Sequence, residues 1–203
     1  MTNLVSHSRA LRGFIQRRAA QIRRAALVLS ALLLVAVIFQ PLWGLTLWSI
    51  QFPKGLRMIV YPTTIKGNIN DINVLNHYIG MAPVSDEFFP ELDVLPAVFV
   101  ATTVACLIAA VVRRRWLTLV PLLMLAGTAI YGLWSMKRRL YQFGNELDPE
   151  AAMTIDPFTP PVFGEFRIAQ FATYSYFGLG TTLAVCAGAL VALAFLLDLK
   201  KVA

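Results

Sequence analysis

Four long apolar stretches dominate the pattern of hydrophobic and polar positions along the chain, and polar segments of unequal length separate them. Each stretch is long enough to cross the hydrocarbon core of a bilayer, which takes about 20 residues of α-helix. None of them contains Asp, Glu, Lys, Arg or His. The sequence therefore predicts four transmembrane helices, which cover residues 25–47, 95–112, 116–136 and 176–197.

The polar segments between and around these stretches define the predicted layout. Three arginines at 113–115 are all that separates the second span from the third, so these two spans form an antiparallel hairpin with a short cytoplasmic turn. The other predicted segments are a cytoplasmic basic tail at 1–24, a first outer loop at 48–94, a second outer loop at 137–175 and a cytoplasmic tail at 198–203.

A β-hairpin is predicted where the chain leaves the first span. Residues 45–50 alternate between apolar and polar or small positions, and residues 56–61 form a β-prone run. Between them lie Pro53, Lys54 and Gly55, and proline followed closely by glycine is typical of a tight turn. We therefore expect residues 45–61 to form two antiparallel strands.

The spacing of apolar residues changes further along the same loop. Ile72, Leu75 and Ile79 recur at intervals of three and four residues, which predicts a short amphipathic helix over 71–79 that ends at Gly80. The predicted fold is thus an all-α membrane protein, a four-transmembrane-helix bundle with a small extracytoplasmic α+β cap, hairpin plus short helix, in the first outer loop.

The second outer loop is expected to be irregular through its middle, because four prolines between 149 and 161 oppose extended helix there. Residues 166–174 are predicted to form a short interfacial helix just before the fourth span.

Composition supports a membrane protein. The 203 residues are 58% hydrophobic and only 14% charged, whereas soluble domains carry about 25% charged residues. The formal net charge of +7 would suggest nucleic acid as a partner for a soluble protein, but here the basic residues bracket the apolar stretches. Such an arrangement orients a protein in the bilayer, so we expect lipid and other proteins as partners, and no nucleic acid.

The distribution of charge predicts which side each segment faces. With the N-terminus inside, eleven of the 18 Lys and Arg residues lie on the cytoplasmic face and seven on the outer face, while ten of the eleven acidic residues lie outside. The positive-inside rule favours this orientation. The predicted location is a bacterial inner (cytoplasmic) membrane, crossed several times, with both termini in the cytoplasm.

Several kinds of chemistry lack the residues that they require. An autonomous pump needs ionisable residues within the spans, and a b-type haem needs histidines there; the predicted spans have neither. A Cys-x-x-Cys-His motif for c-type haem and a phosphate-binding glycine loop for a nucleotide are also absent from the sequence. Cys106 and Cys186 are expected to act as small apolar residues. The sequence therefore predicts a protein that is not an enzyme.

One constellation in the first outer loop suggests metal binding. His77 is followed by Met81 four residues later, and one helical turn would bring both side chains to the same face. Imidazole and thioether suit copper, Cu(I) especially. We therefore predict His77, Met81 and Met58 as Cu(I) ligands, with Met153 as a further outer thioether. Alternatively, His77 forms a hydrogen bond within the outer region or with a partner while Met81 packs.

Several stretches resemble an uncharacterised family of four-span bacterial membrane proteins. They are "PLWGLTLWSIQFPKGL" and "GNINDINVLNHYIGM" between Pro41 and Met81, "FPELDVLP" at 89–96, and "LDPEAAMTI" from Leu147. Genes of that family are often found among accessory genes for nitrous oxide reductase and other copper enzymes, so the resemblance implies a role near copper-enzyme maturation. Where that family tends to have a histidine before the "LDP" stretch, this chain has Asn145 and Glu146; if that histidine is a second metal ligand in the family, His77 is more isolated here.

These observations lead to two functional hypotheses. The first is a non-catalytic inner-membrane accessory protein that assists maturation of, or copper supply to, a periplasmic copper or respiratory enzyme. The alternative is a small structural subunit of a larger membrane complex. Its spans would pack on partner helices through small residues, of which the fourth span has four: Gly178, Gly180, Ala187 and Gly188.

Overall fold

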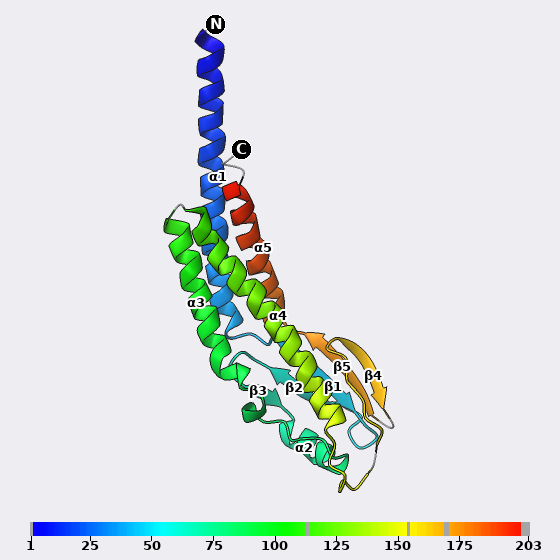
Figure 1. Ribbon diagram of the computed structural model, residues 1–203. Coiled ribbons are helices and arrows are strands. Elements are labelled where there is room, and N and C mark those ends of the chain that lie inside the picture. Colours follow the sequence, from blue (N-terminus) through cyan, green and yellow to red (C-terminus); the bar gives the residue numbers. More distant parts are fainter. Residues whose placement is uncertain (1, 113, 154, 169–170, 200–203) are drawn as a thin grey trace. The chain divides into compact units, whose positions relative to one another are not determined.

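The computed structural model describes residues 2–112, 114–153, 155–168 and 171–199. Four of its helices are long and apolar enough to cross a membrane, which confirms the predicted number of spans and a multi-pass membrane protein (Figure 1). These helices are α1 (Thr2–Val37, with the apolar span at Gln16–Val37), α3 (Glu91–Val111), α4 (Arg115–Asn145) and α5 (Leu179–Leu199). Arg113 of the predicted turn and residues 200–203 of the predicted tail lie outside the described residues.

The end of the first span differs from the prediction. Helix α1 ends at Val37 rather than at residue 47, and Trp43–Trp48 is strand β1. Pro41 has no backbone N–H to continue a helical ladder and disfavours helical backbone in the residue before it. The alternating residues that follow then pair as a strand, so residues 43–47 were wrongly included in the span.

The ends of the other spans also shift. Helix α3 begins at Glu91, before the predicted start at residue 95, and α4 continues past residue 136 to Asn145. The extension of α4 is amphipathic, because Leu140 and Phe143 are buried in a core while Arg138 stays exposed. Helix α5 begins at Leu179, later than residue 176, because the residues before it belong to a strand.

A five-stranded antiparallel sheet is the main feature outside the spans (Figure 1). Its order is β3-β2-β1-β5-β4, and the other strands are β2 (Leu56–Val60), β3 (Ile65–Gly67), β4 (Gly164–Ile168) and β5 (Phe171–Phe177). The predicted hairpin is confirmed as β1 and β2, which pair from Trp43 with Val60 to Leu47 with Leu56.

The predicted all-α class was wrong, because the chain is mixed α/β: the segments 48–94 and 137–175 together build a sheet-containing unit larger than the predicted cap. Strand β1 pairs along its whole length with β5, from Trp43 opposite Phe177 to Trp48 opposite Ala172. Strands β4 and β5 occupy most of the stretch in which an interfacial helix was predicted, so that prediction was wrong. In β4 exposed Glu165 and Arg167 alternate with half-buried Phe166 and Ile168, which is the period of a strand rather than a helix.

One face of the sheet is buried by helices. Residues 71–79, predicted as a helix, lie almost entirely within α2 (Ile69–Tyr78). Side chains of α2, α3 and α4 and of the intervening loop pack on this sheet face, in a core cluster of Trp43, Leu45, Leu56, Met58, Val60, Ile72, Leu75, Ile79, Val84, Phe89, Leu92, Leu140, Phe143 and Phe171. The buried indole of Trp43 donates from Nε1 to the Val162 carbonyl, 2.7 Å away, so its polar atom is also satisfied.

The chain divides into two compact units, and each has its own interior. One comprises residues 1–35, 99–126 and 183–203 of the helices. The other comprises residues 36–98 and 127–182 and contains the sheet; we call this second unit the sheet domain.

Candidate functional site

Helix α2 presents two different faces. Ile72 and Leu75 are buried in the core of the sheet domain, whereas Val74 and Tyr78 are 58% and 57% exposed and His77 is exposed beside them. The exposed residues line a shallow hollow together with two asparagines of the same helix, Asn70 and Asn73. This surface, which we call the α2 face, thus combines an imidazole, a phenol and amide groups with an apolar side chain.

The C-terminal end of α2 is hydrogen-bonded to the segment 148–153. Gly80 has a φ of +75°, and its carbonyl accepts a hydrogen bond from the Asp148 N–H at 2.8 Å. The Tyr78 carbonyl accepts another from the Met153 N–H at 3.0 Å. The two stretches "NHYIGM" and "LDPEAAM", far apart in the sequence, therefore fold against each other at the C-terminal end of α2.

Two asparagine side chains hold the segment that follows α2. Asn73 donates from Nδ2 to the Val84 carbonyl at 3.0 Å and accepts from the Val84 N–H at 2.7 Å. Asn76, which is buried, donates to the Ala82 carbonyl at 3.3 Å. Residues 82–84 thereby return along the helix and fix its end. The sequence analysis did not single out these asparagines, although amide side chains beside a glycine turn are a frequent sign of such local bonding.

The predicted copper ligands lie in different surroundings. His77 is on the exposed α2 face, whereas Met58 is buried in the core of the sheet domain and Met81 packs against that core. Met153 is exposed, and its backbone reaches the end of α2 through the bond to Tyr78. Among the described residues no group of three His, Cys, Asp or Glu side chains is placed to hold a metal ion. The His77 imidazole is thus on the surface and the Met58 thioether is in the core. The copper ligand set stays a prediction.

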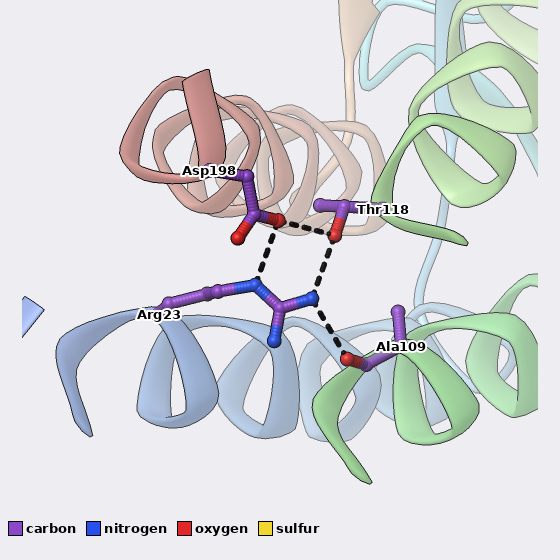
Figure 2. Close-up of polar contacts among 4 residues, drawn as sticks. All are labelled: Arg23, Ala109, Thr118 and Asp198. Carbon is purple, nitrogen blue, oxygen red and sulfur yellow. Dashed lines mark hydrogen bonds and ion pairs between the residues drawn. The ribbon is translucent and has the colours of Figure 1, made fainter. Parts of the chain in front are cut away.

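A second polar cluster lies inside the helical unit (Figure 2). Arg23 of α1 donates from Nε to Asp198 Oδ2 of α5 at 2.7 Å, and its Nη2 donates to Thr118 Oγ1 of α4 and to the Ala109 carbonyl of α3, both at 2.9 Å. The Thr118 hydroxyl donates in turn to Asp198 Oδ2 at 2.8 Å. One guanidinium therefore connects all four membrane helices.

The burial of this cluster makes its charges significant. Arg23 is 2% exposed, Asp198 is 7% exposed and Thr118 is fully buried. Paired, hydrogen-bonded charges are how ionisable groups are tolerated near apolar surroundings. Arg23 Nε, Arg23 Nη2 and the Thr118 hydroxyl each donate to an acceptor on another helix, so the arrangement can fix the four helices against one another.

The sequence analysis missed this cluster. It placed Arg23 in the basic tail and Asp198 in the cytoplasmic tail, so both lay just outside the predicted spans. The spacing of residues in the sequence could have indicated this cluster. Arg23 is four residues before Leu27 and eleven before Leu34, so all three lie on one helical face. Both leucines on that face are fully buried.

The sheet domain has a polar link of its own between two helices. Glu91, at the start of α3, accepts hydrogen bonds from the Ser135 hydroxyl and from Arg139 Nη2 of α4, the latter at 3.1 Å. The Arg139 guanidinium also lies over the Phe88 ring, 5.1 Å from its centroid. These contacts hold the first turn of α3 beside the extended part of α4.

Three of the four small residues of the predicted fourth span are in contact with other parts of the chain. Gly178 and Gly180 lie against the Pro41 carbonyl, which leaves no room for a Cβ atom. Ala187 is buried, and its carbonyl accepts from the Ser30 hydroxyl at 3.1 Å. Only Gly188 of this set faces open space. The predicted contact surface for a larger complex is therefore largely occupied by the protein's own residues.

A scan against protein-family models and a search of curated proteins each found no match.

Proposed function

We propose that this chain is a non-catalytic accessory protein of a bacterial inner membrane. In this proposal both termini are cytoplasmic, the sheet domain is periplasmic, and the α2 face docks a periplasmic copper or respiratory enzyme during its maturation or copper supply. The observation that carries the proposal is the exposed group of His77, Tyr78 and Val74 on a helix whose other face and C-terminal end are fixed by the core and by the 148–153 segment.

The chemistry of the α2 face suits recognition better than catalysis. His77 has a tyrosine and two asparagines as neighbours in the hollow. These side chains can form hydrogen bonds to a partner, and among the described residues that line the hollow no Ser or Cys nucleophile is paired with the imidazole. Exposed tyrosine beside an apolar residue is typical of residues that anchor protein interfaces. The imidazole adds a group that can pass a Cu(I) ion or accept a hydrogen bond.

The copper half of this proposal can be tested by titration. We expect the purified protein in detergent, competed against a Cu(I) chelator, to bind one Cu(I) ion, and His77→Ala to weaken that binding by at least about tenfold, since one ligand is lost. Asn70→Ala, which alters the same hollow without removing an imidazole or thioether, is the matched control. Equal and weak Cu(I) binding by all three proteins would remove copper from the proposal and leave docking alone.

The proposed location has an independent test. Lys54 is exposed in the turn between β1 and β2, so Lys54→Cys in a background with Cys106→Ala and Cys186→Ala should react with a membrane-impermeant maleimide added to intact cells. Arg115→Cys, in the predicted cytoplasmic turn, should react only after the membrane is permeabilised. The reverse result would place the sheet domain in the cytoplasm and end the proposal of a periplasmic role.

A further inference from the structure

The face of the sheet opposite the core has a distinct composition. Strand alternation and register put Thr46 and Trp48 of β1 on this face, with Arg57 of β2 opposite Thr46 and Tyr174 of β5 on its other side. The Trp48 and Thr46 side chains lie on the same side of β1, because a Cβ built on Gly55 would contact both the Trp48 indole and the Thr46 methyl group. We call this surface the outer sheet face.

Aromatic rings occupy its centre. Trp48 and Tyr174 are 37% and 38% exposed, and the Tyr174 ring stacks on Tyr176 with the ring centroids 6.0 Å apart. The Tyr176 ring in turn lies over Gly44, where no Cβ would fit. Because each ring rests on a neighbour or a glycine, the platform is rigid and little side-chain entropy is lost when a partner covers it.

Cations flank this aromatic centre on both sides. Arg57 is one strand away from β1, and Arg167 of β4 lies opposite Ala172 of β5, which is itself opposite Trp48. Three strand spacings and an offset of two residues along the strands separate the Cα atoms of the two arginines, about 16 Å in all. Both are exposed, and among the described residues neither takes part in a salt bridge. Lys54 at the adjoining turn and Lys66 of β3, opposite Ile59, add two more cations, against one carboxylate, Glu165, which lies opposite Tyr174.

The two ends of β1 differ in their surroundings. The sheet connects to α1 and α5 at one end, where the Gly178 N–H donates to the Leu42 carbonyl and the Gly180 N–H donates to the Pro41 carbonyl, both at 2.8 Å. Trp48 lies at the other end of β1, which at the strand rise is about 17 Å from Trp43. Trp48 is therefore at the end of β1 away from Leu42 and Gly178.

We infer that the outer sheet face binds an acidic segment of a partner protein, one that places apolar side chains on Trp48 and Tyr174 and carboxylates on Arg57 and Arg167. Tryptophan, tyrosine and arginine are the residues most enriched where binding energy concentrates, and exposed cations on either side of apolar rings complement carboxylates. The inference rests on the proposed docking function but names the partner's chemistry, and it uses none of the residues of the α2 face.

The test uses the full chain in detergent and two short fluorescein-labelled peptides, one of alternating Glu and Leu and one of alternating Lys and Leu. We expect fluorescence anisotropy to show saturable binding of the Glu peptide only. Arg57→Glu/Arg167→Glu should weaken it by about 30-fold or more, as should Tyr174→Ala. Raising the salt concentration from about 0.05 M to about 0.5 M should also weaken it.

Lys137→Glu/Arg138→Glu is the matched control, because it makes the same change in net charge at exposed positions of α4, a helix that packs on the opposite, core face of the sheet. It should leave peptide binding within about twofold of the original protein, since interactions between exposed, distant charges are screened. The inference is overturned if both peptides bind alike or if the two double variants lose binding equally. It is also overturned if anionic phosphatidylglycerol vesicles, and not the Glu peptide, bind in a manner that depends on Arg57 and Arg167. Retained peptide binding in His77→Ala would show that this surface and the α2 face act independently.

Discussion

Arg23→Ala should destabilise the folded protein by about 3–5 kcal/mol, because it leaves the Asp198 carboxylate buried without its cation. The pair lies among four helices, so solvent cannot replace the lost guanidinium without opening the bundle. Unfolding of the purified protein by added denaturing detergent, followed by tryptophan fluorescence, measures the change. Arg24→Ala is the matched control: Arg24 is the next residue of α1 but is exposed, so its loss should cost less than about 0.5 kcal/mol.

A double variant separates two contributions to the loss of stability: the loss of the ion pair itself and the cost of a buried charge left without a partner. Arg23→Met/Asp198→Leu removes both charges and keeps apolar volume, and such replacements of buried pairs are often neutral or stabilising. We therefore expect it to be more stable than Arg23→Ala alone. If Arg23→Ala and Arg24→Ala unfold at the same detergent concentration, the guanidinium does not connect the helices in the folded protein as the geometry indicates.

The sequence was a good guide wherever structure depends on neighbouring residues. Four apolar stretches without charge can do little but span a bilayer, and the turn at Pro53, Lys54 and Gly55 specifies the β1–β2 hairpin locally. The helix over 71–79 followed in the same way from the spacing of Ile72, Leu75 and Ile79. In each case the physical cause lies within about 20 residues of its effect.

Contacts between distant segments were beyond the reach of this reasoning. Strand β1 pairs with β5, so that Trp48 lies opposite Ala172, and nothing local to either residue specifies the other. The sequence analysis therefore gave the cap to the first outer loop alone. The alternation of Glu165, Phe166, Arg167 and Ile168 was a readable sign of a strand, and the expectation of an interfacial helix before a membrane span outweighed it.

The candidate site shows the same limit. The placement of His77 and Met81 four residues apart suggested a shared helical face, but α2 ends at Tyr78 and the chain turns at Gly80 before Met81. Met58 is on the core face of its strand because Leu45 of β1 lies opposite it. Whether a thioether is a ligand candidate or a core residue is thus decided by strand register, which a single sequence expresses only weakly.

Gly80→Ala should have the second large effect, a loss of about 2–4 kcal/mol of stability, since it combines a positive φ with overpacking. A Cβ at Gly80 would lie 2.8 Å from the Asp148 carbonyl oxygen, 2.9 Å from the Asp148 nitrogen and 3.0 Å from the Ala151 Cβ. Two of these atoms are backbone and cannot rotate away. The 148–153 segment must therefore move from the end of α2, and its hydrogen bonds to Gly80 and Tyr78 should break.

The measurement combines detergent unfolding with hydrogen exchange. In Gly80→Ala the amides of Asp148 and Met153 should exchange faster, because they donate to the Gly80 and Tyr78 carbonyls. Gly132→Ala is the matched control, since Gly132 is helical and a Cβ there would meet no atom within 4 Å beyond its own helical turn, and alanine there should stabilise by about 0.5–1 kcal/mol. Unchanged exchange at both amides would mean that the two outer segments are not joined through Gly80. If Gly80→Ala both speeds exchange at these amides and weakens Cu(I) binding, the fixed end of α2 contributes to Cu(I) binding, because this variant keeps the His77 imidazole.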